Sequence, residues 1–170
     1  DQVVIDYFLT YTKFLIDEYK QEVKYWLTFN EINMICWSPY LGGGMFVEKS
    51  KRDRLSCIHQ ALHHQFVASA RAVKLGKAIN PDFQFGTMIC HITVYPLTCN
   101  PDDVLMTQQE DLMRNCFSGD VQVKGVYPYY IKRYFERHGI EFDITQQDLK
   151  ELREGTVDFY SFSYYMSNCI

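Results

Sequence analysis

The stretch Tyr25-Trp26-Leu27-Thr28-Phe29-Asn30-Glu31-Ile32-Asn33 decides the fold of this chain. It begins as a strand, because apolar residues occupy every second position from residue 23 to residue 29. Three polar residues, Asn30, Glu31 and Asn33, then follow where the strand ends. Parallel α/β barrels carry their catalytic residues at the carboxyl ends of their strands. The stretch therefore makes Glu31 a candidate catalytic carboxyl, although a surface glutamate that opens a loop would give the same pattern.

Helical and strand patterns alternate along the rest of the chain. This order predicts an α/β fold with about three parallel strands and flanking helices, in one segment of residues 1–170. A loop is expected from Cys36 to Lys51; its glycines 42–44 indicate a turn and lack the spacing of a phosphate-binding loop. The predicted helices are residues 3–20, 53–79, 100–117, 128–138 and 145–155, and the predicted strands are residues 23–29, 84–95 and 157–165.

Several helix ends carry local signals. Asp1 is the only candidate cap for the first helix, and Asn100-Pro101 supplies a cap residue followed by an N1 proline. Thr145 with Asp148 forms a capping box, and Gly139 is a C-terminal stop. The inner face of the long helix is predicted to consist of Leu55, Ile58, Leu62, Phe66, Ser69 and Val73.

Composition excludes several classes of protein. The chain has 170 residues, is 47% hydrophobic and carries a net charge of −4, which predicts a packed domain without a nucleic-acid partner. No apolar run reaches the ~20 residues of a membrane span, and no signal peptide is expected. The six cysteines lack a C-x-x-C pair, which favours reduced thiols of a cytoplasmic protein over a disulfide framework. They are Cys36, Cys57, Cys90, Cys99, Cys116 and Cys169.

Four segments resemble family 1 glycoside hydrolases, which are retaining β-glycosidases on a (β/α)8 TIM barrel. Residues 23–31, which end in Thr-Phe-Asn-Glu, resemble the acid/base segment of that family. Val94-Tyr95-Pro96, Asp120 to Pro128 and Val157 to Tyr165 resemble the end of its fifth strand, its G-x-Y-P segment and its sixth strand. The resemblance covers essentially the whole chain and implies a partial barrel, from the third helix to the sixth strand.

Within the family, three segments resemble the 6-phospho-β-glucosidase branch. These are Ile32-Asn33, where a proline commonly follows the glutamate, Thr98 to Asp102, and Phe162 to Tyr165. Two positions depart from the family pattern, since Ser163 and Cys90 stand where many relatives carry asparagine. Both departures weaken inferences about polar contacts at those two positions.

The resemblance implies a role for three residues in a double-displacement mechanism. Glu31 would be the acid/base, Asn30 would bind the sugar 2-hydroxyl, and Tyr165 would hydrogen-bond the nucleophile. On pattern alone Tyr165 is a core aromatic that ends a strand. The nucleophile and the sugar-phosphate contacts are expected after Ile170, so the chain by itself is expected to be inactive. The implied substrate is a phosphorylated β-glucoside in the cytoplasm, and no cofactor is required.

Four further side chains allow two interpretations each. His59 and His63 lie one helical turn apart, a spacing that metal ligands use, yet Gln60 stands where a zinc protease carries glutamate. We therefore predict no metal and expect His59, His63 and His64 to pack against the barrel wall. Trp37 either lines the aglycone side of a sugar site or anchors a loop.

Two kinds of rival function are open at this point. One is a family 1 β-glucosidase or a 6-phospho-β-galactosidase, which share the same motifs. The other is a non-enzymatic interaction domain derived from the barrel, which would oligomerise through the open edges of its sheet.

Overall fold

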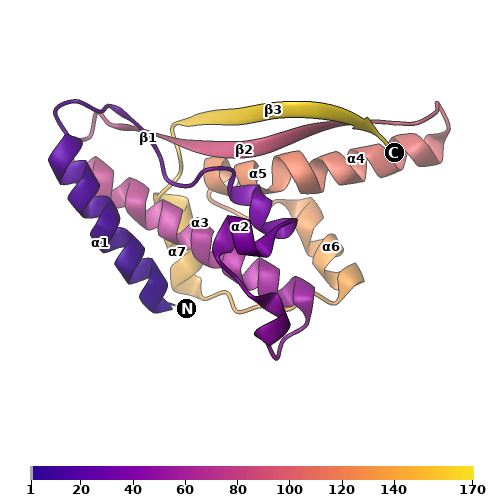
Figure 1. The fold of residues 1–170 in the computed structure, drawn as a ribbon, viewed down its shortest axis with the longest axis horizontal. Helices are drawn as coiled ribbons and strands as arrows, with labels where there is room; N and C mark the ends of the chain where they lie inside the picture. The colour runs from indigo at the N-terminus through magenta and orange to yellow at the C-terminus, as the bar shows by residue number, and fades with distance from the viewer. Residues whose placement is uncertain (1) are drawn as a thin grey trace.

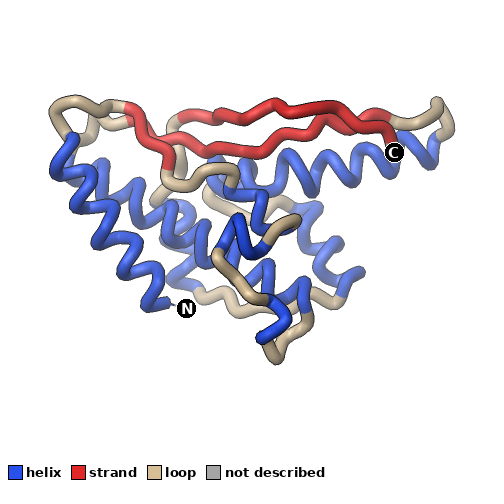
Figure 2. Tube along the Cα trace, in the orientation of Figure 1, coloured by secondary structure: helices blue, strands red, loops and turns tan. Residues whose placement is uncertain are grey.

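The fold is a single sheet covered by helices on one face (Figures 1 and 2). A computed structural model describes residues 2–170, apart from the side chain of Lys49. The strands β1 (Tyr25–Leu27), β2 (Gln84–Tyr95) and β3 (Phe159–Cys169) are parallel and lie in the order β1-β2-β3. The predicted architecture, three parallel strands with flanking helices, is confirmed. The other face of the sheet is bare in Figure 1.

Helices make up the layer beneath the sheet. The α-helices are α1 (Gln2–Tyr19), α2 (Pro39–Gly43), α3 (Arg54–Ile79), α4 (Pro101–Asp111), α5 (Phe117–Lys124), α6 (Tyr129–His138) and α7 (Gln146–Glu154). Two short 3-10 helices are η1 (Ile32–Cys36) and η2 (Val47–Lys49), and a π-helical turn, η3 (Leu112–Cys116), joins α4 to α5.

The core lies between α3 and the middle of β2. Phe66, Phe85 and Ile89 are almost fully buried there. Helix and sheet approach so closely that a Cβ on Gly76 would come within 2.1 Å of the Phe85 ring, which explains the glycine in a helix interior. Five of the six residues predicted for the inner face of α3 are buried; Leu55 is 36% exposed, because it lies in the first turn, at the edge of the core.

The locally encoded helix ends are confirmed. Asn100 Oδ1 accepts the Asp102 N–H at 3.0 Å, and Thr145 and Asp148 form the reciprocal capping box. Gly139 adopts φ 60° as the C-cap of α6. Asp1, the expected cap of α1, lies outside the described residues.

Four predicted boundaries were wrong. The last strand, predicted over residues 157–165, covers Phe159–Cys169, because its pairing with β2 continues past the bulge at Tyr165. The first strand covers only Tyr25–Leu27, because the chain bends at residues 28–30. The helix expected to end at Phe117 continues through η3 and α5 to Lys124, and Gly125 in the left-handed conformation ends it. The loop from Cys36 to Lys51 contains α2 and η2.

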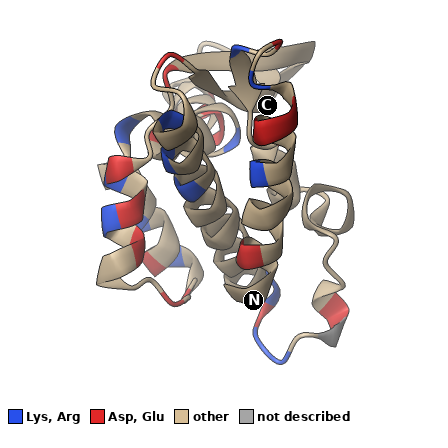
Figure 3. Ribbon diagram, turned by 90° about the vertical axis from the view of Figure 1, so that its left-hand side faces the viewer, with Lys and Arg blue, Asp and Glu red and all other residues tan. Residues whose placement is uncertain are grey.

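The outer surface of α7 is more densely charged than that of α1 (Figure 3). Acidic and basic residues alternate along α7, and Glu151 and Glu154 both accept hydrogen bonds from Lys74 of α3 at 2.7 and 2.6 Å. Exposed apolar side chains follow one face of α1: Val4, Tyr7, Tyr11 and Phe14. Within residues 2–170, no helix has the length and apolarity needed to cross a membrane.

Candidate active site at the carboxyl edge of the sheet

Glu31 lies just past the carboxyl end of β1, in an unusual backbone conformation. It is the N-cap of η1, with φ 47° and ψ 54°. Among residues 2–170 it is the only residue other than glycine with a positive φ. Such a conformation costs on the order of 1–3 kcal/mol and persists only when the surrounding structure holds it in place. The sharp turn directs the chain from the strand into η1.

Tyr165 reaches Glu31 from the other side of β2. Its hydroxyl donates a hydrogen bond to Glu31 Oε1 at 2.6 Å, although 134 residues separate the two in sequence. This hydrogen bond and the negative charge of Glu31 raise the pKa of Tyr165. The structure thus brings together the two residues that the family resemblance assigned to the catalytic centre.

A β-bulge places Tyr165. Tyr164 pairs with His91 and Met166 pairs with Ile92, so Tyr165 is the extra residue of β3 and has no partner on β2. Bulges re-aim side chains and are common beside active sites. Tyr165 is 59% exposed, so its side chain stands above the sheet rather than within a core.

Asn30 and the two departures from the family pattern lie in the same region. Asn30 is exposed beside Glu31, and its role as a sugar ligand stays a prediction. Cys90 of β2 pairs with Ser163 of β3. Burial, with a smaller effect of the Glu31 charge, raises the pKa of the Cys90 thiol, which is therefore a neutral neighbour of the site.

Trp37 follows η1 and is partly exposed. The guanidinium of Arg114 lies 5.9 Å from the centre of its ring, within the range of a cation–π contact. Arg114 Nε also donates to Glu110 at 2.6 Å, which fixes the guanidinium. The ring contacts Arg114 and the residue is 36% exposed, which fits both interpretations of Trp37.

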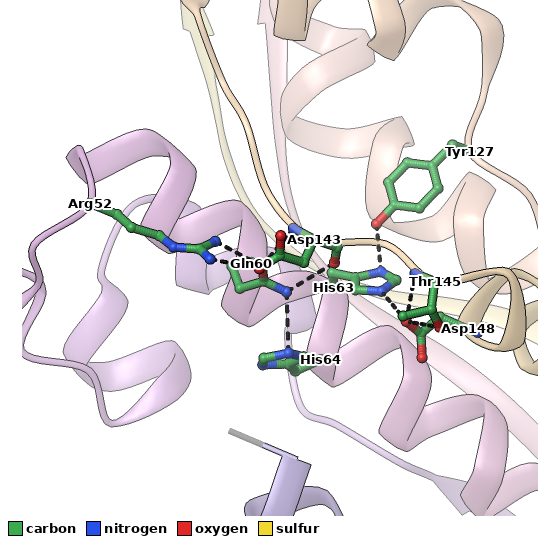
Figure 4. A network of polar contacts seen from close by, with 8 residues as sticks. All are labelled: Arg52, Gln60, His63, His64, Tyr127, Asp143, Thr145 and Asp148. Atoms are coloured by element: carbon green, nitrogen blue, oxygen red, sulfur yellow. Dashed lines mark hydrogen bonds and ion pairs between the residues drawn. The ribbon is translucent and has the colours of Figure 1, made fainter.

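The three histidines of α3 do not form a metal site. His59 is 5% exposed, and its Nδ1 lies 2.9 Å from the Leu55 carbonyl oxygen, among the rings of Phe135 and Phe142. His63 contacts Tyr127 and Asp148 instead of a shared ligand (Figure 4). Among residues 2–170, no group of three His, Cys, Asp or Glu side chains could hold a metal ion.

Figure 4 shows that His63 belongs to a polar network inside the helical layer. Its Nδ1 lies 3.0 Å from the Tyr127 hydroxyl, and its Nε2 lies 3.4 Å from Asp148 Oδ2, which is longer than a good hydrogen bond. Burial lowers the pKa of His63, so the ring is neutral. Its Nδ1 accepts a hydrogen bond from the Tyr127 hydroxyl, and its Nε2–H points toward Asp148.

Two buried asparagines lie next to the site; sequence reasoning named Asn33 without its contacts and did not name Asn115. Asn33 is 2% exposed and bonds to the backbone of Cys90 in both directions, through Oδ1 at 2.9 Å and Nδ2 at 2.8 Å. Asn115, also 2% exposed, does the same at Ile92, at 3.1 and 2.9 Å. Asn33 stood out only as a polar residue after the strand, and Asn115, between Arg114 and Cys116, carried no signal in the sequence.

This geometry defines a class of protein. Parallel strands with helices on one face, and a carboxyl and a phenol in contact at the carboxyl edge of the sheet, describe a segment of an α/β-barrel enzyme. The sequence profile described as Glycosyl hydrolase family 1 matches residues 1–170. The chain belongs to glycosyl hydrolase family 1.

Two curated relatives narrow the comparison. A 6-phospho-beta-glucosidase of Dickeya chrysanthemi is 46% identical over 100% of this chain and 35% of its own length. The aryl-phospho-beta-D-glucosidase BglH of Bacillus subtilis strain 168 is 44% identical over 96% of this chain and 34% of its own length. The chain therefore spans about a third of the length of these relatives.

Solved structures support the fold. A beta-glucosidase from Exiguobacterium marinum superimposes with a TM-score of 0.78 at 24% identity, covering 99% of this chain and 38% of that one. At this identity the likeness concerns the fold alone. The partial barrel that the sequence predicted is confirmed.

Proposed function

We propose that residues 1–170 are the acid/base-bearing part of a 6-phospho-β-glucosidase, which hydrolyses a phosphorylated β-glucoside to glucose 6-phosphate and an aglycone. The observation that carries the proposal is the 2.6 Å contact between the Tyr165 hydroxyl and Glu31 at the carboxyl edge of the sheet. The phosphorylated substrate is supported by two relatives, an aryl-phospho-beta-D-glucosidase and a 6-phospho-beta-glucosidase, which are 44% and 46% identical to this chain.

Glu31 acts twice in the proposed double displacement. As an acid it protonates the glycosidic oxygen, while a second carboxylate attacks the anomeric carbon and the aglycone leaves as an alcohol. As a base it then takes a proton from water, whose oxygen attacks the same carbon and releases the second carboxylate. The two carboxyl groups of a retaining enzyme lie ~5 Å apart. We assign the second carboxylate to a strand outside residues 1–170.

Asn30 and Tyr165 support the two carboxylates. The Asn30 amide binds the sugar 2-hydroxyl, a contact that strengthens in the transition state. The Tyr165 hydroxyl donates to the attacking carboxylate and favours its ionised form. Its exposure and its position in the bulge leave the phenol free to move from Glu31 to that partner.

We assign the protein to the cytoplasm and to carbohydrate metabolism. The six cysteines are all free, as is usual in a reducing compartment. Trp37, supported by Arg114, lines the aglycone side in this proposal.

A hybrid enzyme tests the assignment of Glu31. Residues 1–170 replace the matching third of the Dickeya chrysanthemi enzyme, and hydrolysis of a nitrophenyl 6-phospho-β-glucoside is measured. Glu31→Gln should lower kcat/KM by about 10²–10⁴-fold, the usual contribution of a general acid–base group. With Glu31→Ala, azide should restore turnover and give the β-glycosyl azide, because azide attacks the glycosyl-enzyme without a base.

The matched control is Glu136→Gln on the exposed surface of α6, which should leave the rate unchanged. An active hybrid that is indifferent to Glu31→Gln would refute the role of Glu31. Because the hybrid takes its sugar-phosphate contacts from its host, the substrate class needs the protein encoded by the complete gene. A preference of that protein for unphosphorylated β-glucosides or for 6-phospho-β-galactosides would select one of the rival activities.

We also propose that the isolated chain self-associates through its sheet. β1 and β3 each have an unpaired edge, and Tyr25, Leu27 and Met166 are between 49% and 66% exposed. Light scattering should give a mass above that of one 20.1 kDa chain, and a monomer at all concentrations would contradict this.

A further inference from the structure

The Asn33 side chain connects the Glu31 turn to the rest of the sheet through hydrogen bonds. It is 2% exposed and makes three hydrogen bonds, two with the Cys90 backbone and one from Nδ2 to the Arg114 carbonyl oxygen at 2.8 Å. An asparagine amide can make about four hydrogen bonds, so this one is nearly saturated. It joins η1, β2 and the π-helical turn η3 at one point.

These hydrogen bonds are required because β1 ends early and leaves backbone groups of β2 without a neighbouring strand. β1 pairs with β2 only as far as Gly86. Backbone groups of alternate residues on β2 face the β1 side, as the Gln84 N–H does when it bonds to the Lys24 carbonyl at 2.9 Å. Cys90 lies in the same alternation, beyond the end of β1, and its N–H and C=O are satisfied by Asn33. The amide thus takes the place of a neighbouring strand.

Asn33 lies two residues after Glu31, whose backbone is strained. The Asn33 bonds fix η1 on β2 at Cys90, and the next hydrogen bond of the segment, from the Met34 N–H to the Glu31 carbonyl at 2.8 Å, closes the turn. Cys90 pairs with Ser163, two residues before Tyr165. Glu31 and Tyr165 are therefore both placed relative to the same residue of β2.

We propose that Asn33 is a positioning residue, which holds the strained turn so that the Glu31 carboxyl stands where it meets Tyr165 and a glycosidic oxygen. The catalytic part of this inference rests on the proposed function. Asn33→Leu removes all three bonds, and Asn33→Asp places a carboxylate against the carbonyl oxygens of Cys90 and Arg114. Asn33→Leu thus leaves the turn with none of the three contacts, whereas Asn33→Asp keeps only the bond from the Cys90 N–H.

The comparison variant is Asn115→Leu. Asn115 is equally buried and bonds in the same way to Ile92, two residues further along β2, but it lies in η3 and not in the Glu31 turn. If Asn33 only satisfied the edge of β2, substitutions of Asn33 and of Asn115 would have equal effects. If Asn33 positions Glu31, its variants should show effects that the Asn115 variant does not.

The first measurement uses the 170-residue chain and needs no turnover. The Tyr165 phenol is titrated by NMR on 13C-tyrosine-labelled protein. Its signal is identified as the one that is absent from the spectrum of Tyr165→Phe. Its raised pKa should fall in Glu31→Gln, fall to a similar value in Asn33→Leu, and stay raised in Asn115→Leu. If Asn33→Leu keeps the raised pKa while the chain stays folded, the proposal is overturned.

The second measurement uses the hybrid enzyme and two leaving groups. For a poor leaving group such as an alkyl alcohol, Asn33→Leu should lower kcat/KM by about 10²-fold, as expected for a misplaced acid. For dinitrophenolate, which leaves without a proton, the loss should stay within about threefold. Equal losses on both substrates would reduce Asn33 to a structural role. An active hybrid that is insensitive to Glu31→Gln would overturn the proposed function instead, so the two failures are distinguishable.

Discussion

Two polar clusters of this chain, each built around a tyrosine, differ in almost every physical respect. His63, Tyr127 and Asp148 lie in the helical layer, where the His63 side chain is 1% exposed and each polar group faces another residue of the chain. Glu31 and Tyr165 lie at the open edge of the sheet, on a strained turn and a β-bulge. The polar groups of the first cluster are buried and face one another, whereas those of the second are accessible to a ligand.

This difference in burial and backbone strain distinguishes structural from functional polar residues better than residue type does. His59 and His63 have the spacing of metal ligands in the sequence, yet in the structure they contact Leu55, Tyr127 and Asp148. A single glutamate with positive φ marks the candidate site. Strained backbone conformations cluster at sites that bind ligands.

The largest expected effect concerns turnover by the isolated chain. His63 meets its partners within the chain, whereas the double displacement proposed for Glu31 needs a second carboxylate, which we assign to a strand outside residues 1–170. We expect the 170-residue chain to leave a 6-phospho-β-glucoside chromogen unhydrolysed, measured by release of the chromophore. Turnover that disappears with Glu31→Gln would contradict this and show that the sheet-edge site works without residues from outside the chain.

Removing one phenol hydroxyl from each cluster gives the next effect. Tyr127→Phe leaves the buried His63 Nδ1 without a partner and should cost about 1–3 kcal/mol of unfolding free energy. The matched change Tyr165→Phe removes an exposed hydroxyl and should stay within about 0.5 kcal/mol. Urea unfolding of both variants makes the comparison. Equal costs would mean that both tyrosines are structural.

The smallest effect is the pH dependence of stability. Burial lowers the pKa of His59 and His63, and it lowers that of His64 to about 4. Because the unfolded chain binds protons near pH 6.5 and these folded histidines do not, stability is full above that pH and is lost as pH falls toward 4. One such group contributes a slope of at most about 1.4 kcal/mol per pH unit.

Urea unfolding at pH 7.5, 6 and 5 measures this slope. His63→Gln should reduce it, since one of the buried rings no longer resists protonation. A pH dependence that is the same with and without His63 would place the acid sensitivity elsewhere.

Local signals in the sequence were reliable, and long-range ones were not. The capping box of Thr145 and Asp148 involves residues three positions apart, so its pattern is visible in the sequence. The partners of Asn33 lie 57 and 81 residues away, and nothing in the sequence around it names them. The bulge at Tyr165 and the π-helical turn at residues 112–116 each insert one residue into a regular pattern, which periodicity alone cannot locate.

The candidate site was predicted in part. The position of Glu31 at a strand end follows from the alternation of residues 23–29 and the polar residues after them. Family resemblance placed Tyr165 in the catalytic centre as the partner of the nucleophile, so its hydrogen bond to Glu31 was not predicted. Pattern alone would have made this tyrosine a core residue, as is common near the end of an apolar strand. The strain at Glu31 could not be predicted, since a glutamate in the left-handed conformation depends on the tertiary contacts that hold it.

The two asparagines that replace a strand beside β2 also affect how this protein meets other proteins. A sheet edge with free N–H and C=O groups is a template on which a foreign strand can add, and such addition begins aggregation. At Cys90 and Ile92 those groups are already occupied by side-chain amides of Asn33 and Asn115. The wall of the candidate site can therefore remain open to a sugar while it is closed to another polypeptide.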